Sequence, residues 1–170
     1  MTLTVIALGS NLDNPPRQLN EALLKLSRLP GLTGLNVSSV FTSPPMGPQD
    51  QPPFFNAVAT CLYAEEPRQL LAELQAIEQA MGRVKARRWG ERCIDLDIIH
   101  MGEQLIDEGD LVIPHPGISE RLFVLEPMIE LLGADHKVPG LDDLGTLRDG
   151  LKHHSISLCE DIDISSATVA

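Results

Sequence analysis

The sequence predicts an α+β domain, in which one mostly antiparallel sheet carries helices on both sides. Three observations lead to this fold class: strand-like segments alternate with amphipathic helical segments, the connections between them are short, and 170 residues are enough for one domain but too few for two ordinary ones. The order strand, helix, strand, strand, helix, strand is that of the ferredoxin-like split arrangement.

The first half of the chain supplies most of these elements. Residues 2–8 have strand composition, and Asn14 is expected to cap a helix in which Leu19, Ala22, Leu23 and Leu26 recur at helical spacing. Further strands are expected over 35–43 and 56–63. A second helix is expected from Pro67 to Met81, with Gly82 ending it.

A proline-rich stretch separates those two strands. Residues 44–53 hold five prolines in ten positions, which excludes regular secondary structure. Such a stiff loop suits the preformed wall of a binding site, and it equally suits a rigid surface connection.

The second half contains one central strand and several shorter elements. The expected segments are a strand over 93–100, short strands over 104–106 and 111–113, a helix over 121–132 capped by Ser119, and a short helix near 141–150. We therefore expect one domain over residues 1–150, followed by a weakly ordered tail over 151–170, where no period is visible.

Composition limits the classes of function. The chain is 43% hydrophobic and carries a net charge of −11, as expected for a soluble globular protein whose surface repels nucleic acid away from any local basic patch. No signal peptide or membrane span is expected. Cys61, Cys93 and Cys159 lack ligand-like spacing, so free thiols and a cytoplasmic location are predicted.

The chemistry is concentrated around the central strand. Alternation places Asp95 and Asp97 on one face of it, about 6.6 Å apart along the strand, a separation that suits two Mg²⁺ ions. Asp-x-Asp alone equally fits the solvated face of an antiparallel strand. However, five of the thirteen Lys/Arg residues lie just before it, at Arg83, Lys85, Arg87, Arg88 and Arg92.

Cations beside a carboxylate pair indicate a polyphosphate ligand, whose charge both groups can share. The sequence contains neither Gly-x-x-x-x-Gly-Lys-Ser/Thr nor Gly-x-Gly-x-x-Gly. Side chains and metal ions, rather than a glycine-rich loop, must therefore hold the phosphates.

Four segments together resemble one enzyme family, in its order and at its usual spacing. They are Gly9-Ser10-Asn11-Leu12, the proline-rich residues 44–52, Gly82-Arg83 with residues 88–97, and Pro114-His115 with residues 120–127. The chain resembles the 6-hydroxymethyl-7,8-dihydropterin pyrophosphokinases of the folate pathway over roughly residues 2–150.

The resemblance implies transfer of pyrophosphate from ATP to the hydroxymethyl group of the pterin, with release of AMP. It implies that Asp95 and Asp97 bind two Mg²⁺ ions and also that they, with Arg83 and Arg92, are catalytic. For ATP it implies contacts from Gln75, Glu78, Arg88, Trp89, Arg92, Ile98, His115 and Arg121. For the pterin it implies that the two phenylalanines stack on the ring. The residues implied to contact the pterin are Ser43, Pro45, Met46, Phe54, Asn56, Asp95 and Phe123.

Each of these residues also has an ordinary structural explanation. Phe54 and Phe123 could be core residues, His115 a loop histidine, and Arg121 or the pair Gln75 and Glu78 solvated surface. Whether Lys85 or Arg87 reaches phosphate is left open, and no general base is evident.

Two other functions stay open. One is a small RNA-binding sheet domain using the basic loop 83–92, and the other is a pterin-binding protein without catalysis. The acidic balance argues against RNA, and the complete set Asp95, Asp97, Arg92 and His115 argues against lost catalysis. We expect a monomer that binds small molecules and neither nucleic acid nor membrane.

Overall fold

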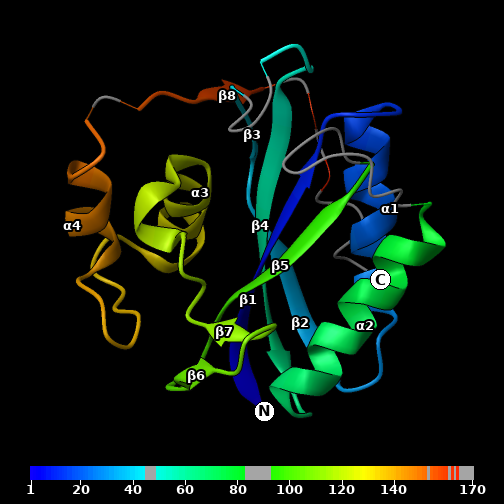
Figure 1. Ribbon diagram of the computed structural model, residues 1–170, viewed down its shortest axis with the longest axis vertical. Coiled ribbons are helices and arrows are strands. Elements are labelled where there is room, and N and C mark those ends of the chain that lie inside the picture. Colours follow the sequence, from blue (N-terminus) through cyan, green and yellow to red (C-terminus); the bar gives the residue numbers. More distant parts are fainter. Residues whose placement is uncertain (45–48, 83–92, 153, 161, 163, 165–170) are drawn as a thin grey trace.

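The fold consists of three layers, with a central sheet between two helical layers (Figure 1). The structure is a computed structural model that describes residues 1–44, 49–82, 93–152, 154–160, 162 and 164. This arrangement confirms the α+β class with a mostly antiparallel sheet and helices on both sides.

The central sheet has six strands among the described residues. Its order is β5-β1-β4-β3-β8, with β2 also paired to β4, and all of these pairings are antiparallel. The strands are β1 (Thr2–Ser10), β2 (Leu32–Val37), β3 (Val40–Ser43), β4 (Phe54–Tyr63), β5 (Asp95–Met101) and β8 (Ser157–Cys159). A separate two-stranded hairpin joins β6 (Ile106–Asp107) to β7 (Val112–Ile113).

One helical layer contains α1 (Pro15–Ser27) and α2 (Pro67–Ala80), and the other contains α3 (Leu122–Leu132) and α4 (Leu144–Asp149). In Figure 1 the two pairs lie on opposite sides of the sheet. A short 3₁₀ turn, η1 (Ile118–Glu120), leads into α3. Both proline-started helices, α1 and α2, begin where the sequence predicts.

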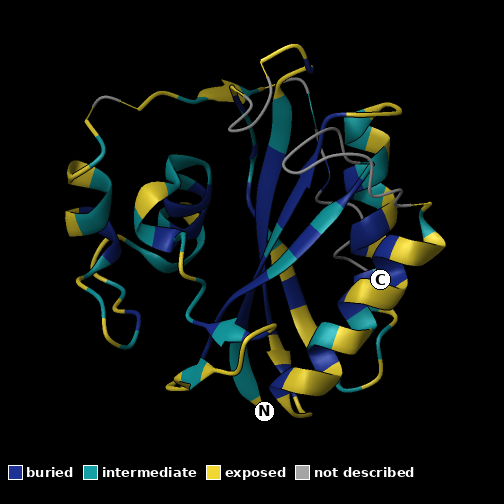
Figure 2. Cartoon of the chain, in the orientation of Figure 1, coloured by how far each residue is buried: buried dark blue, intermediate teal, exposed yellow. Residues whose placement is uncertain are grey.

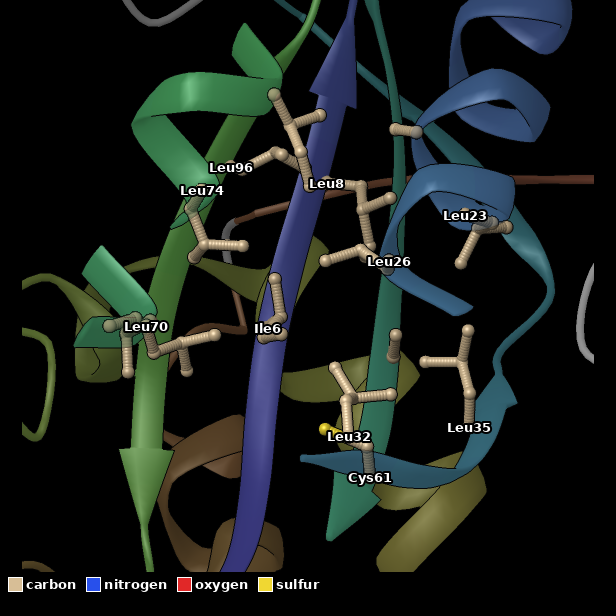
Figure 3. Close-up of a cluster of buried hydrophobic side chains, with 14 of the residues drawn as sticks. Ile6, Leu8, Leu23, Leu26, Leu32, Leu35, Cys61, Leu70, Leu74 and Leu96 are labelled. Atoms are coloured by element: carbon tan, nitrogen blue, oxygen red, sulfur yellow. The ribbon is translucent and has the colours of Figure 1, made fainter. Parts of the chain in front are cut away.

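The larger core fills the face of the sheet that α1 and α2 cover. Figure 3 shows Ile6 and Leu8 of β1 among leucines from both helices, including Leu23, Leu26, Leu70 and Leu74. All are at most 2% exposed, and burying one such side chain contributes about 1.5–3 kcal/mol. Figure 2 shows buried residues along the strands, with exposed residues on the outer sides of the helices.

A smaller core fills the opposite face, under α3. Val5 and Val58 of the sheet pack there with Val124, Leu125 and Met128. The pairing of β1 with β5 shifts at this level: Ile6 pairs with Ile98 and Val5 with His100, which leaves Ile99 as an extra residue. Ile98 packs in the α1/α2 core and Ile99 in the α3 core, and the extra residue allows His100 to lie opposite Val5 of that same α3 core.

The prediction of one strand over 35–43 is wrong, because the chain forms β2 and β3 with a turn between them. The Ser38 hydroxyl accepts from the Val58 amide at 2.9 Å, and the Ser39 amide and hydroxyl both donate to the Glu130 carboxylate. Serine hydroxyls that bond to the backbone compete with ladder formation. The turn is thereby attached to the end of α3.

Two predicted caps also differ from the structure. Ser119 lies inside η1, and Arg121 occupies the N-cap position of α3. Asn14 does occupy the N-cap position of α1, but with φ 62° and without a side-chain cap bond. Its carbonyl accepts from the amides of Arg17 and Gln18 instead.

Regular structure also occurs beyond residue 150. Strand β8 pairs with β3, and Ile164 is buried in the α1/α2 core. The prediction of a weakly ordered tail over 151–170 stays a prediction for the segment as a whole. Among the described residues, no helix is both long and apolar enough to cross a membrane.

The buried Tyr63 hydroxyl offers a test of core polarity. Tyr63 is 1% exposed at the end of β4, and its hydroxyl has no hydrogen-bond partner. Removing an unpaired buried hydroxyl relieves a desolvation penalty of about 1–3 kcal/mol. We expect Tyr63→Phe to raise Tm by a few degrees in a thermal melt followed by circular dichroism, on the order of 2–4 °C per kcal/mol.

The matched variant Tyr63→Leu should lower Tm, because it leaves a cavity in place of the ring. A Tm of Tyr63→Phe below that of the wild type would contradict the burial of an unpaired hydroxyl.

Candidate active site

One register row across the sheet organises the site. Gly9 of β1 pairs with Asp95 of β5 on one side and with Asn56 of β4 on the other, and Asn56 in turn pairs with Phe41 of β3. Neighbouring strands lie about 4.8 Å apart, so Asp95 and Asn56 stand roughly 10 Å from each other across Gly9. Gly9 is itself buried, and because it has no side chain, no Cβ from β1 stands between the two polar groups.

Asp95 and Asp97 lie on the same face of β5, as the alternation predicts. Leu96 and Ile98 point into the α1/α2 core, whereas Asp97 pairs with Ala7, which packs on the α3 side. Both carboxylates are half-buried. They therefore share the face that carries Gly9 and Asn56.

Glu78 fixes the strand that carries them. It is only 3% exposed, and its Oε2 atom accepts from the Leu96 amide at 2.9 Å. The alternative of a solvated pair on α2 is therefore wrong for Glu78, while Gln75 is exposed. A buried carboxylate on the open edge of β5 satisfies an amide that would otherwise lack a partner strand.

His115 is attached to β5 through its own backbone. Its backbone amide donates to the Ile99 carbonyl at 2.9 Å, which attaches it to β5, and its Nδ1 atom accepts from the Gly117 amide at 3.0 Å. Burial of the ring and, to a lesser extent, the positive charge of Arg121 lower the pKa of His115 to about 4, although the Asp95 carboxylate opposes the shift. The Arg121 guanidinium lies beside Gly117, the residue whose amide donates to this imidazole.

A second polar group lies at the β4–β3 end of the row. Asn56 is 4% exposed, and its Nδ2 atom donates to the Ser43 hydroxyl at 2.8 Å. Its Oδ1 atom lies 3.4 Å from the point where a Cβ on Gly9 would stand, and the Phe54 ring lies 3.8 Å from that point. The amide oxygen and the ring thus both lie within van der Waals distance of the position that a Gly9 side chain would take.

Phe123 approaches the same side of the sheet from α3. It packs partly buried against the α3 core, and the Arg121 guanidinium carbon lies 6.0 Å from the centre of its ring. Phe54 and Phe123 therefore both lie on the α3 side, one from β4 and one from the start of α3. Core packing and a ligand contact are compatible for Phe123, because its burial is incomplete.

The sequence patterns do not reveal one connection within the site. Asn11 and Gln51 are both at least 94% buried, and the Asn11 Nδ2 atom donates to Gln51 Oε1 and to the Pro52 carbonyl, each at 3.0 Å. This contact ties the end of β1 to the proline-rich residues. Asn11 belongs to the Gly-Ser-Asn segment noted above, but its partner could not be identified from spacing alone.

Not all candidate residues can be placed on this face. Pro45, Met46, Arg83, Arg88, Trp89 and Arg92 lie outside the described residues, as do Lys85 and Arg87. The Ile98 side chain is 6% exposed and lies in the α1/α2 core, on the opposite face from Asp97. Any contact of Ile98 with a nucleotide would therefore come from its main chain.

Comparison with known proteins identifies the family. The family model of the 7,8-dihydro-6-hydroxymethylpterin-pyrophosphokinases (HPPK) matches residues 5–133. The chain belongs to this family. It is 47% identical to the 2-amino-4-hydroxy-6-hydroxymethyldihydropteridine pyrophosphokinase of Haemophilus influenzae over 131 residues, which cover 77% of this chain and 82% of that protein.

Two other relatives extend the comparison. The enzyme of the same name from Pseudomonas aeruginosa is 47% identical over 126 residues, covering 74% of this chain and 78% of that protein. The folic acid synthesis protein fol1 of Pneumocystis carinii is 45% identical over 137 residues; these cover 80% of this chain but 18% of that longer protein.

Solved structures agree on the fold. A Plasmodium falciparum HPPK-DHPS triple mutant with STZ-DHP superposes with a TM-score of 0.69 at 14% identity, covering 88% of this chain and 43% of that one. An HPPK-DHPS in complex with substrates gives a TM-score of 0.66, also at 14% identity, with 88% of this chain and 43% of that one covered. The HPPK chain described here thus spans less than half of these solved chains.

The histidines of this face make stability depend on pH. His100 of β5 is 2% exposed, its Nε2 atom lies 3.2 Å from Nε2 of His136, and burial followed by His136 lowers its pKa to about 4. The pKa of His115 is lowered as well. The unfolded state, with pKa near 6.5, binds protons first, so stability is complete above that pH and falls as the pH drops towards 4.

We expect the urea midpoint of the wild type to fall between pH 7.5 and pH 5, with His100 contributing on the order of 2 kcal/mol. In His100→Leu the urea midpoint should fall less steeply with decreasing pH, because only the contribution of His115 remains. The exposed control His154→Gln should follow the wild type. Equal slopes for His100→Leu and wild type would contradict the assignment.

Proposed function

We propose that ATP and 6-hydroxymethyl-7,8-dihydropterin meet on the face formed by β5, β1 and β4, where pyrophosphate passes to the pterin hydroxymethyl group. The observation that carries this proposal is the row Asp95, Gly9 and Asn56. Two carboxylates lie at one end, an amide and an aromatic ring lie at the other, and a residue without a side chain lies between them.

The activity itself follows from the family. The family match and the names of the relatives confirm the prediction of an ATP-dependent pyrophosphokinase, a transferase that acts on hydroxymethyldihydropterin in folate biosynthesis. The alternative of an RNA-binding sheet domain is not supported by these findings.

Asp95 and Asp97 fit two Mg²⁺ ions. Within the described part of the chain, no group of three or more His, Cys, Asp or Glu residues could hold a metal ion. A site of two carboxylates on one strand suits Mg²⁺, which usually takes one or two protein carboxylates and completes its shell with water and substrate phosphates. Bound there, the ions would neutralise charge on the triphosphate.

His115 and Arg121 are proposed to contact the triphosphate. With a pKa near 4, His115 is neutral at pH 7, and because its Nδ1 atom accepts a hydrogen bond, the proton resides on Nε2. His115 thus donates one hydrogen bond, while Arg121 supplies positive charge. Further nucleotide contacts are proposed from Gln75, Glu78, Arg88, Trp89 and the main chain of Ile98, with Arg83 and Arg92 as catalytic cations.

The pterin is proposed to lie over Gly9. Phe54 and Phe123 offer ring faces to a flat heteroaromatic, which gains from stacking between them. Asn56 Oδ1 offers an acceptor to the polar edge of the ring, and Ser43, Pro45 and Met46 would complete this end of the site. A side chain on Gly9 would occupy the position of the ring.

The reaction depends on how the two substrates are positioned, and it forms no covalent bond to the protein. The hydroxymethyl oxygen attacks the β-phosphorus of ATP, the bond from that phosphorus to the AMP oxygen breaks, and the hydroxyl proton is released. Asp95 lies next to the β1 backbone over which the pterin would sit, so this geometry brings nucleophile and phosphate together.

The remaining predictions complete the proposal. Residues 1–150 form one catalytic domain that acts as a monomer on small-molecule substrates, without nucleic acid or membrane. A cytoplasmic location is supported by the cysteines, because the spacing of Cys61, Cys93 and Cys159 does not suggest a disulfide framework.

Asp95→Ala and Asp97→Ala should each lower kcat at least about a hundredfold, because each removes a ligand of the Mg²⁺ that would neutralise transition-state charge. The assay follows AMP and pterin diphosphate from ATP, Mg²⁺ and hydroxymethyldihydropterin. The control Asp107→Ala, on the exposed face of β6, should keep wild-type turnover. Near wild-type turnover in both β5 variants would rule out the metal assignment.

Asn56→Ala should act on the other substrate. We expect KM for the pterin to rise about tenfold or more, the cost of one directed hydrogen bond, with KM for ATP within twofold of wild type. Asn36→Ala on the exposed side of β2 is the matched control. An equal rise in both KM values would argue against a pterin contact at Asn56.

A further inference from the structure

The C-terminal segment, here the described residues 157–160, 162 and 164, lies against the strand that supplies Ser43. Its strand β8 pairs with β3 through Val40↔Cys159, Phe41↔Leu158 and Thr42↔Ser157. Figure 1 shows β8 beside β3 at the upper end of the sheet, far in sequence from β3 but adjacent in space. These residues lie beyond the family match, which ends at 133.

Strand β3 depends on neighbours for its position. It is four residues long and pairs with β4 only over Phe41, Thr42 and Ser43. Strand β8 occupies its other edge. A strand this short has few ladder bonds of its own, so pairing on both edges determines where its last residue, Ser43, is held.

Side chains anchor the segment in the larger core. Ile164 is 2% exposed within the α1/α2 cluster, and Ile162 and Cys159 pack against that cluster. By contrast, Leu158 is 51% exposed. The Thr42 hydroxyl also donates to the Ser157 carbonyl at 3.5 Å. The segment is thus fixed at one end by strand pairing and at the other by burial of an isoleucine.

We propose that the C-terminal segment positions the pterin end of the site by holding β3, and with it the Ser43 hydroxyl, against Asn56. This inference rests on the proposed function. Ser43 accepts from Asn56 Nδ2 at 2.8 Å, which orients the amide so that Oδ1 borders Gly9. If β3 shifts, the amide loses that partner and its orientation, and the pterin loses a directed acceptor.

The nucleotide end should not depend on this segment. Asp95 and Asp97 belong to β5, at the opposite edge of the sheet from β8. His115 and Arg121 are attached through β5 and the start of α3. Loosening β8 should therefore weaken pterin binding selectively.

The main test compares Ile164→Ser with Ile164→Val and with Leu158→Ser, in the full chain and well below each melting temperature. Pterin affinity is titrated by fluorescence with a non-hydrolysable ATP analogue and Mg²⁺ present, and KM is measured for both substrates. We expect Ile164→Ser to weaken pterin binding about 5- to 20-fold and to leave KM for ATP within twofold. Ile164→Val and Leu158→Ser should bind pterin like the wild type.

If Ile164→Ser does not fold, Thr42→Val tests the same inference, because it removes only the hydrogen bond from the Thr42 hydroxyl to the Ser157 carbonyl. A two- to fivefold loss of pterin affinity at unchanged KM for ATP is then expected. Unchanged pterin affinity in the folded variant, with only a lower Tm, would overturn the inference, as would an equal loss for both substrates.

The activity of the wild type distinguishes failure of this inference from failure of the proposed function. Wild-type chain that forms no AMP from ATP and the pterin would overturn the proposed function and this inference together. An active wild type with an unaffected Ile164→Ser overturns the positioning role alone.

Discussion

The register of β1 against both its neighbours is the constraint on which the site depends. Gly9 is bracketed by Asp95 and Asn56 because nine consecutive pairs join β1 to β4 and because β1 pairs with β5 over the same stretch. A strand has a side-chain period of two, so a slip of one residue would turn both carboxylates into the α1/α2 core. Burying two unpaired charges there would be prohibitive, and the two cores together exclude that alternative.

Much of this could be predicted from local pattern. The alternation through Asp95, Leu96, Asp97 and Ile98 identifies a strand and assigns its faces, and helical spacing identifies α1 and α2 with their buried leucines. These features are local, because each depends on residues within one or two turns or one strand. The fold class then follows from element order.

What could not be predicted depends on partners distant in sequence. The Ser38–Ser39 turn is fixed by Val58 and Glu130, the burial of Glu78 by Leu96, and the Asn11 contact by Gln51. None of these partners lies within the window that a periodic pattern covers. Strand β8 is a similar case, since Ser157 to Cys159 have no strong alternation and gain their strand conformation from β3.

One face of the sheet forms the larger core and the other carries the proposed site, and the side chains of β1 differ accordingly. On the α1/α2 side, Ile6 and Leu8 are both large and fully buried. On the α3 side, the residues of the same strand become smaller along its length, from Val5 to Ala7 to Gly9, while α3 packs at the level of Val5.

On the α3 face, β1 thus contributes a large apolar side chain at one end and none at the other, where Asp95 and Asn56 flank Gly9. A small-molecule site needs a few positioned polar groups on a rigid support, and the opposite core supplies that rigidity without occupying the site. The decrease in side-chain size along one strand is therefore what allows a single short sheet to be both a stable core and a binding surface.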